Sequence, residues 1–291
     1  MPYKTFSFLV LLLGIQAISV LSARGEEFGN ALESPEAPWL KSENHDEGES
    51  EAEHLETDRD SFTPATTTVG NGRVIFESAY SFIQNRTAAD EHSYPEIITR
   101  VGLTKRLELR LGWNYESGGG GSVSGGDAGG ELEEAGSRTE SQTLYGFKYS
   151  LTKQQTWIPQ SAVIVQATTP TSGPNTFNDT QVGYVFGWKF LHDWQLDSSV
   201  RYVSTKEEGD HFNEWAPSVV LKVPVTDRWN AHAEYFGIIT DGKVQARNHQ
   251  YFSPGIHYLF SPNCEVGVRV GWGMTEDAAN FFTNVGFGLR L

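Results

Sequence analysis

The sequence has little of several features on which common protein classes depend. Its 291 residues include one cysteine and two methionines, and only 20% of them are charged. The lone Cys264 excludes an intramolecular disulfide and a cysteine-based metal cluster, and it is most simply a small buried hydrophobe. No basic stripe is present, which argues against nucleic acid as a partner. Beyond residue 21 no apolar run approaches the length of a transmembrane helix.

The residues that are abundant favour strands and turns. Glycine occurs 30 times and aromatic residues make up 12% of the chain. Aromatic residues are enriched in strands, and glycine marks the turns between them. The composition therefore predicts one large all-β domain rather than a helical protein.

The N-terminus has the three parts of a secretory signal. Lys4 precedes an apolar stretch at residues 6–21, and the small residues Ser22 and Ala23 come before a charged run. This order predicts a signal peptide over residues 1–23. A membrane anchor is the alternative interpretation, but the apolar stretch is short for a span.

The net charge of −15 is concentrated in one segment. Between residues 26 and 60 there are 13 acidic residues against Lys41 and Arg59. Such a segment buries too little apolar surface to offset the entropy of ordering. We predict an acidic, disordered periplasmic linker over residues 24–71, with a tail that binds cations or a partner as the alternative.

Residues 95–116 show the pattern that organises the rest of the chain. Two alternating segments are joined by a turn at residues 104–106, and in the second segment every other residue is apolar. A strand would carry these residues on one face and polar residues on the other, whereas a helix would mix them. The apolar set is Leu107, Leu109, Leu111, Trp113 and Tyr115, and the polar set is Glu108, Arg110, Gly112 and Asn114.

The same pattern predicts twelve strands within residues 72–291. Connections after even-numbered strands are short and those after odd-numbered strands are long, which is typical of a transmembrane antiparallel up-and-down β-barrel with periplasmic termini. A soluble sandwich or barrel is the alternative. The predicted strands are residues 73–84, 95–103, 107–116, 141–151, 157–168, 180–191, 194–203, 214–223, 229–239, 250–260, 264–272 and 281–291.

Charged residues fall on the polar parity of these strands, so they are expected to face the lumen. Lys or Arg on the lipid face would cost about 2–4 kcal/mol near the membrane midplane. Seven of the eight tryptophans lie near strand ends, as in the aromatic girdles of membrane barrels. The lumen charges either pair across a narrow, filled barrel or line a water-filled pathway. The pathway candidates are Glu77, Glu96, Arg100, Glu108, Arg110, Lys148, Lys189, Asp197, Arg201, Lys222, His232, Glu234, His257, Glu265, Arg269 and Arg290.

An enzymatic lumen site is the weaker alternative. His232, Glu234 and His257 have suitable side chains, but no Gly-x-Ser-x-Gly motif accompanies them, so no catalytic residue, metal site or cofactor is predicted. The glycine-rich residues 118–130 lack the Lys and Ser or Thr of a phosphate-binding loop and predict a flexible extracellular loop. Four nearby acids are the alternative site for a divalent cation: Asp127, Glu131, Glu133 and Glu134.

Three short stretches carry a family resemblance. Residues 56–63 read ETDRDSFT, residues 77–82 read ESAYSF and residues 102–110 read GLTKRLELR. Together they resemble the outer-membrane transporter family associated with meta-pathway phenol degradation, over about residues 56–291. The family pattern Thr-Asp-Arg-Pro-Asp differs here, because Asp60 follows Arg59 directly. The resemblance implies a barrel that takes up small compounds, with aromatic ones as candidates.

These observations predict a channel in the bacterial outer membrane that passes small solutes through a narrow charged lumen. A sealed structural or adhesive barrel that acts through its loops is the alternative. The expected partners are outer-membrane lipid, a small-molecule solute and the barrel-assembly machinery, to which a final strand ending in Leu291 would be an atypical signal. Oligomeric state and solute identity stay open. The motif before the first strand is predicted to dock at the periplasmic mouth or to enter the lumen as a plug, through Glu56, Thr57, Asp58, Arg59, Asp60 and Phe62.

Overall fold

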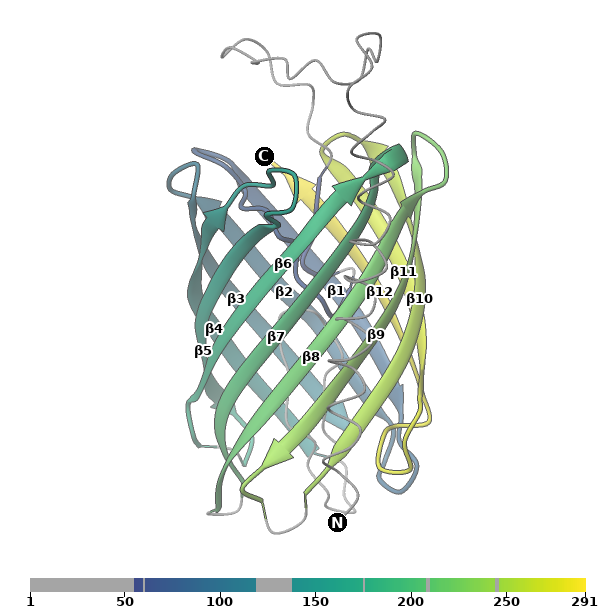
Figure 1. Ribbon diagram of the computed structural model, residues 1–291. Helices are drawn as coiled ribbons and strands as arrows, with labels where there is room; N and C mark the ends of the chain where they lie inside the picture. Colours follow the sequence, from purple (N-terminus) through teal and green to yellow (C-terminus); the bar gives the residue numbers. More distant parts are fainter. Residues whose placement is uncertain (1–54, 60, 119–137, 175, 208–209, 244–245) are drawn as a thin grey trace, which may run out of the picture. The chain divides into compact units, whose positions relative to one another are not determined.

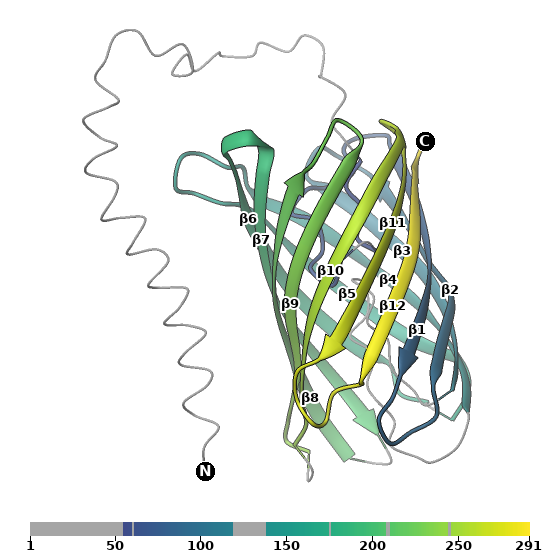
Figure 2. The same ribbon diagram turned by 90° about the vertical axis from the view of Figure 1, so that its right-hand side faces the viewer.

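The computed structural model describes residues 55–59, 61–118, 138–174, 176–207, 210–243 and 246–291. Twelve antiparallel strands close into a barrel, in which each strand pairs with its neighbours in sequence and β1 pairs with β12 (Figures 1 and 2). The prediction of a twelve-stranded up-and-down barrel is therefore confirmed. The strands are β1 Val74–Gln84, β2 Glu91–Gly102, β3 Leu107–Gly118, β4 Arg138–Thr152, β5 Gln160–Ser172, β6 Asp179–Phe190, β7 Trp194–Glu207, β8 Asp210–Pro224, β9 Trp229–Asp241, β10 Asn248–Ser261, β11 Cys264–Gly273 and β12 Phe281–Arg290.

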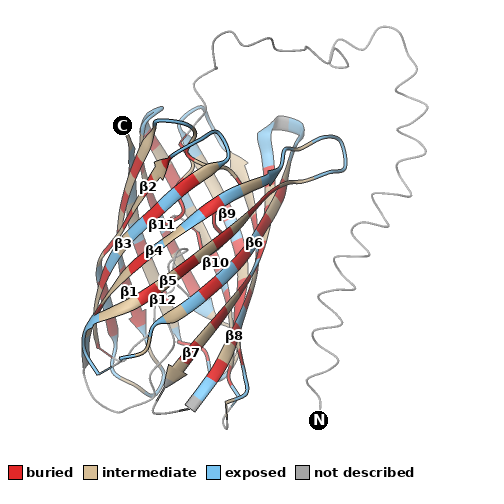
Figure 3. Ribbon diagram, turned by 90° about the vertical axis from the view of Figure 1, so that its left-hand side faces the viewer, coloured by how far each residue is buried: buried red, intermediate tan, exposed pale blue. Residues whose placement is uncertain are grey.

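The alternation in the sequence places one set of side chains outside the barrel and the other inside. Burial alternates along the strands (Figure 3), and in β3 Leu109 and Leu111 are exposed whereas Glu108 and Arg110 are buried. Large apolar side chains are exposed on most strands, which in water would be a costly surface. A lipid bilayer removes that cost, so the outer face of the barrel fits a membrane.

Tryptophans are exposed at both ends of the strands. Trp194 and Trp229 begin their strands at the rim that carries the C-terminus, the upper rim in Figure 1, and Trp113, Trp215 and Trp272 lie toward the other rim. Trp157 was predicted within the fifth strand but precedes β5, in the turn after β4. Exposed aromatic residues at both levels match the interfacial girdles of membrane barrels.

The connections differ in length less than the sequence pattern predicted. Most strands extend further toward the lower rim than expected; β7 and β8, for example, leave only residues 208–209 between them where ten connecting residues were predicted. The polar ends of these strands carry few apolar residues, so periodicity alone missed them. A short 3-10 helix, η2 (Leu191–Asp193), connects β6 to β7.

The predictions for the N-terminal part can be compared with the structure only from residue 55 onward. The signal peptide and the acidic linker up to residue 54 lie outside the described residues, as do most of the glycine-rich loop and its four acids. Within residues 55–69 the linker prediction is wrong, because nearly all the described residues are buried against the barrel strands. No helix in the described part of the chain has the length and apolar character needed to cross a membrane.

Candidate functional site

A segment just before β1 lies inside the barrel. We call residues 55–59 and 61–69 the lumen loop; in Figure 1 it runs from the upper rim into the barrel and back. Its tip, at Phe62 and Thr63, contacts Glu234 in the middle of β9. Its two arms bond to each other, since the Asp58 carboxylate accepts from the Ala65 amide at 2.9 Å and the Thr67 hydroxyl donates to Glu56 at 2.6 Å. Leu55 and Val69 pack with Ile75 of β1, which holds both ends of the loop at the same rim.

The Asp58 carboxylate lies among three cations of the barrel wall. It pairs with Arg110 of β3, with Arg100 of β2 at 3.5 Å and with Lys148 of β4 at 3.4 Å, and all four side chains are at most 1% exposed. The wall contributes two carboxylates to the same cluster, Glu77 and Glu108, so Asp58 supplies the third negative charge that balances the three cations. Such a cluster is stable only while each buried charge keeps its partners.

Wall carboxylates also hold the backbone of the loop. Glu77 accepts hydrogen bonds from the Asp58 amide at 2.7 Å and the Arg59 amide at 3.0 Å, and Glu108 accepts from the Val69 amide at 2.9 Å. Arg59 reaches β2, where it lies 3.8 Å from Glu96. Hydrogen bonds to ionised groups are stronger than neutral ones, so these contacts fix the path of the loop as well as its charge.

The tip of the loop binds the opposite side of the wall. Glu234 of β9 accepts hydrogen bonds from the Phe62 amide at 2.9 Å, the Thr63 amide at 2.7 Å and the Thr63 hydroxyl at 2.7 Å. It also pairs with Arg269 of β11 at 3.2 Å. The Phe62 ring stacks on Phe236 of β9, with a centroid separation of 4.1 Å. The loop thus connects strands from opposite sides of the barrel.

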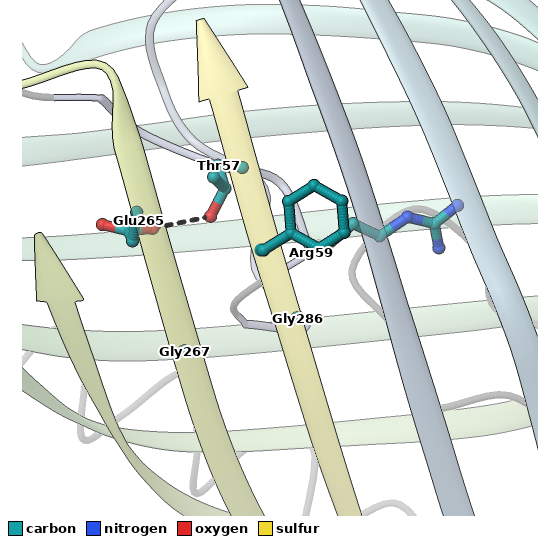
Figure 4. A pocket seen from close by; sticks show the side chains of 7 residues that line it. Thr57, Arg59, Glu265, Gly267 and Gly286 are labelled. Carbon is teal, nitrogen blue, oxygen red and sulfur yellow. Dashed lines mark hydrogen bonds between the residues drawn. The ribbon is translucent and has the colours of Figure 1, made fainter. Parts of the chain in front are cut away.

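Near the upper rim, the loop packs on three glycines of the last two strands, which we call the glycine strip: Gly267 of β11 and Gly286 and Gly288 of β12. The Thr57 hydroxyl donates to Glu265 of β11 at 3.1 Å, as Figure 4 shows, and a Cβ added at Gly288 of β12 would overlap the Thr57 methyl group. A cavity of about 10 Å³ lies between Thr57, Arg59 and this strip. That volume holds about one water molecule, so the loop fits closely against these strands.

Glu56 pairs with Lys189 of β6 at this rim, at 3.2 Å. Burial by itself would raise the pKa of Glu56, but the charges of Lys189 and Lys222 and the hydrogen bond from Thr67 outweigh it and lower the pKa to about 2. Burial likewise acts against the ionised Asp58, yet Arg100, Lys148 and Arg110 keep its pKa well below the usual value. Both carboxylates are therefore ionised at neutral pH, and both attract the loop to the wall.

The contribution of these two carboxylates to loop binding is expected to persist in mild acid and to disappear in strong acid. A carboxyl whose pKa is lowered by binding stabilises the bound state above its ordinary pKa, and that stabilisation is lost as the pH falls through the lowered value. For Glu56 the interval runs from 4.5 down to about 2. Single-channel recordings should show a higher open probability near pH 3 than at pH 5. A Glu56→Gln variant should show a smaller rise between pH 5 and pH 3.

Most predicted pathway residues are buried and lie along the loop. Three are not fully buried or lie at the rim: the Lys189 side chain is 51% exposed, Lys222 is 18% exposed, and Arg290 bonds Asn263 and Pro262 in the turn before β11. These residues lie at the ends of β6, β8 and β12, beyond the part of the lumen that the loop fills. The buried members are Glu77, Glu96, Arg100, Glu108, Arg110, Lys148, Asp197, Arg201, His232, Glu234, His257, Glu265 and Arg269. Their part in a solute pathway stays a prediction.

The three candidates for an enzymatic site do not form one unit. His232 and His257 contact each other, with 2.6 Å between Nδ1 and Nε2, whereas Glu234 bonds the loop tip and Arg269. Glu265 lies 4.0 Å from His257 and accepts from Thr57. Glu234 and Glu265 thus contact the loop, whereas the two histidines contact each other.

Sequence reasoning missed a group of apolar residues that face inward. They pack with Phe62 in one cluster in the middle and lower part of the lumen. The sequence of β9 could have predicted part of this group, because Phe236 and Ile238 lie on the same face of the strand as His232 and Glu234. The other members of the cluster are Ile83, Val203, Ala216, Phe236, Ile238, Tyr251 and Phe282 on the strands, and Ala278 and Ala279 in the connection between β11 and β12.

Comparisons with known proteins agree with this fold. Residues 57–291 match the family model described as "Putative MetA-pathway of phenol degradation". Among solved structures, the COG4313 outer membrane channel from Pseudomonas putida F1 is similar, with 9% identity, a TM-score of 0.52, and coverage of 78% of this chain and 98% of that one. The NanC porin has 9% identity and a TM-score of 0.49, covering 75% of this chain and 100% of its own. No curated protein matches the chain.

At 9% identity, the likeness to the COG4313 channel shows a common fold and no more. The family match is different in kind, since it covers most of the chain and includes the lumen loop from Thr57 onward. The family resemblance found in the three sequence stretches is thereby confirmed. The chain belongs to the family whose model is described as "Putative MetA-pathway of phenol degradation", and its closed barrel with an apolar outer face makes it an outer-membrane protein.

Proposed function

We propose that this protein is an outer-membrane channel for small solutes that is closed at rest by the lumen loop. The observation that carries the proposal is the position of the loop, whose buried residues bond to wall residues on opposite sides of the lumen. Transport then requires the loop to leave its binding site. The COG4313 channel, which shares the fold, supports this proposal without establishing it for this chain.

The charges of the wall suit a lumen that becomes wet when the loop leaves. Without Asp58, the cluster around Arg100 has one more positive than negative charge, and Glu234 loses three hydrogen-bond donors. Buried charges without partners are costly in a dry interior, whereas water satisfies them at little cost. The open state is therefore a hydrated, charged pathway, and the closed state is its dry counterpart. No enzymatic step is part of this proposal.

A disulfide that locks the loop tests the proposal directly. A Cβ at Gly288 would lie 3.7 Å from the Thr57 Cβ, and disulfide-linked residues have Cβ atoms about 3.8 Å apart. We expect Thr57→Cys with Gly288→Cys, in a Cys264→Ser background, to show openings in planar bilayers when reduced and no openings when oxidised. Two variants treated with the same oxidant control for other effects of oxidation: Thr57→Cys alone, and Gly288→Cys with Thr57→Ala, in which the methyl group that a Cβ at Gly288 would overlap is absent.

If the oxidised double variant conducts as the reduced one does, loop movement is not needed and the proposal fails. Mass spectrometry of the oxidised sample must show the disulfide between positions 57 and 288 for this result to count. A lumen that stays closed in the reduced protein, and also after deletion of the loop, would favour the sealed barrel that acts through its extracellular loops.

A further inference from the structure

The Phe62 ring is held as a bound aromatic ligand would be. Phe236 stacks on it at a centroid separation of 4.1 Å and an angle of 12° between the rings. The Arg201 guanidinium lies over the Phe62 ring, 3.7 Å from its centroid. Phe62 itself is fully buried. Stacking and cation–π contacts favour a flat, electron-rich ring over an aliphatic group of the same size.

The wall of this site is apolar and aromatic beyond the contact with Phe62. Tyr251 of β10 stacks on Phe236 at 4.9 Å, and Phe282 of β12 meets Tyr251 edge to face at 5.8 Å. These rings face the inside of a barrel whose other inward residues are largely charged or polar. Lipid contact cannot explain them, because they are on the inner face. Packing against a single loop residue would also need fewer rings.

The polar side of the site is Glu234. Its carboxylate accepts three hydrogen bonds from Phe62 and Thr63 within 2.9 Å, beside the ring. On the same side Arg201 donates to the Phe62 carbonyl oxygen at 3.2 Å. A solute that replaced the loop tip would therefore meet a strong acceptor next to an aromatic platform, and a hydroxyl group on the ring would satisfy it.

We propose that the loop tip occupies a solute-binding site, formed by Phe236, Arg201 and Glu234, for a planar aromatic ring that carries a hydroxyl group. Solute and loop tip compete for this site, so a bound solute favours the state in which the loop is displaced. The inference rests on the proposed function, because a solute reaches the site in the native protein only when the loop moves. It adds the chemical class of the solute and the residues that bind it.

The first test removes only the ring. Phe62→Ala in the full-length protein leaves a ring-sized space between Phe236 and Arg201, and apolar cavities of this kind bind small ring compounds. Calorimetric titration should show phenol binding to this variant at least about tenfold more tightly than cyclohexanol, from the stacking and cation–π contributions. The wild-type protein should bind phenol more weakly, because the Phe62 ring competes for the same site. Equal affinity for the two compounds would overturn the inference.

A second substitution tests whether Phe236 provides the surface on which the aromatic ring stacks. Phe236→Leu combined with Phe62→Ala should weaken phenol binding about tenfold relative to Phe62→Ala alone, because an apolar side chain is kept but the stacking face is lost. The matched control is Phe252→Leu combined with Phe62→Ala, since Phe252 lies on the outer face of β10 and is 41% exposed. Phenol binding that survives Phe236→Leu as well as it survives Phe252→Leu would contradict the assignment.

A conductance measurement separates this inference from the proposed function. In a protein that lacks residues 56–63, phenol should block the current, and anisole, which has the ring without the donor, should block it more weakly. Open channels that phenol does not block, together with no phenol binding to Phe62→Ala, would refute the binding site and leave the plugged channel intact. A deletion variant that folds but does not conduct would refute the channel, and calorimetry on Phe62→Ala would still decide the site.

Discussion

Deleting residues 56–63 is expected to raise the single-channel conductance several-fold. The deletion removes the Asp58 carboxylate, the Phe62 ring and the Thr63 donors, which hold the loop to opposite sides of the wall. Twelve strands enclose more space than the eight whose side chains just fill a barrel, so the emptied lumen should admit water and ions. The measurement is conductance in planar bilayers at neutral pH.

A deletion of residues 40–47 is the matched control, because it removes the same number of residues from the acidic segment and leaves the loop intact. Folding of both variants is checked by circular dichroism and by the shift in gel mobility on heating. Unchanged conductance in a folded protein lacking residues 56–63 would show that the loop does not close the lumen.

Asp58→Asn is the single substitution expected to release the loop most strongly. It keeps the shape of the side chain but leaves three buried cations with two carboxylates, Glu77 and Glu108. Removing one partner of a buried ion pair costs about 3–5 kcal/mol. Even about 3 kcal/mol would shift the equilibrium between bound and released loop about a hundredfold. Open probability in bilayer recordings should rise accordingly, while the barrel keeps its strand content.

Asp227→Asn is the control for this substitution, since Asp227 is exposed in the turn between β8 and β9. It changes the net charge by the same amount far from the cluster. Equal open probability in the two variants would mean that the charge balance around Asp58 does not hold the loop. A larger effect from Asp227→Asn would contradict the proposed closure altogether.

The sequence predicted the barrel wall well because a membrane strand has only two environments. In β3 the alternation of leucines with Glu108 and Arg110 specifies which side faces lipid, and the structure confirms it. The penalty for a charge in lipid enforces this separation at every membrane-facing position. No comparable rule applies to the lumen, where polar and apolar residues are both tolerated.

The lumen loop and the aromatic site could be predicted only in part. The motif around Asp58 was recognisable, but its low content of apolar residues suggested disorder, because the charges that satisfy it come from strands far away in sequence. Phe236 follows the parity of charged residues, and Tyr251 lies in β10, whose alternation is weak. Contacts between a short segment and many distant strands leave no periodic signal in the sequence.

The bond between Thr57 and Glu265 joins residues 208 positions apart, and Gly288 touches the loop from the last strand. Contacts of such long range form late, since the chain between them must be arranged first. The loop therefore cannot complete its binding site until β11 and β12, the last strands of the chain, are in place. We expect a newly assembled barrel to be open to water and ions until the lumen loop has bound inside it.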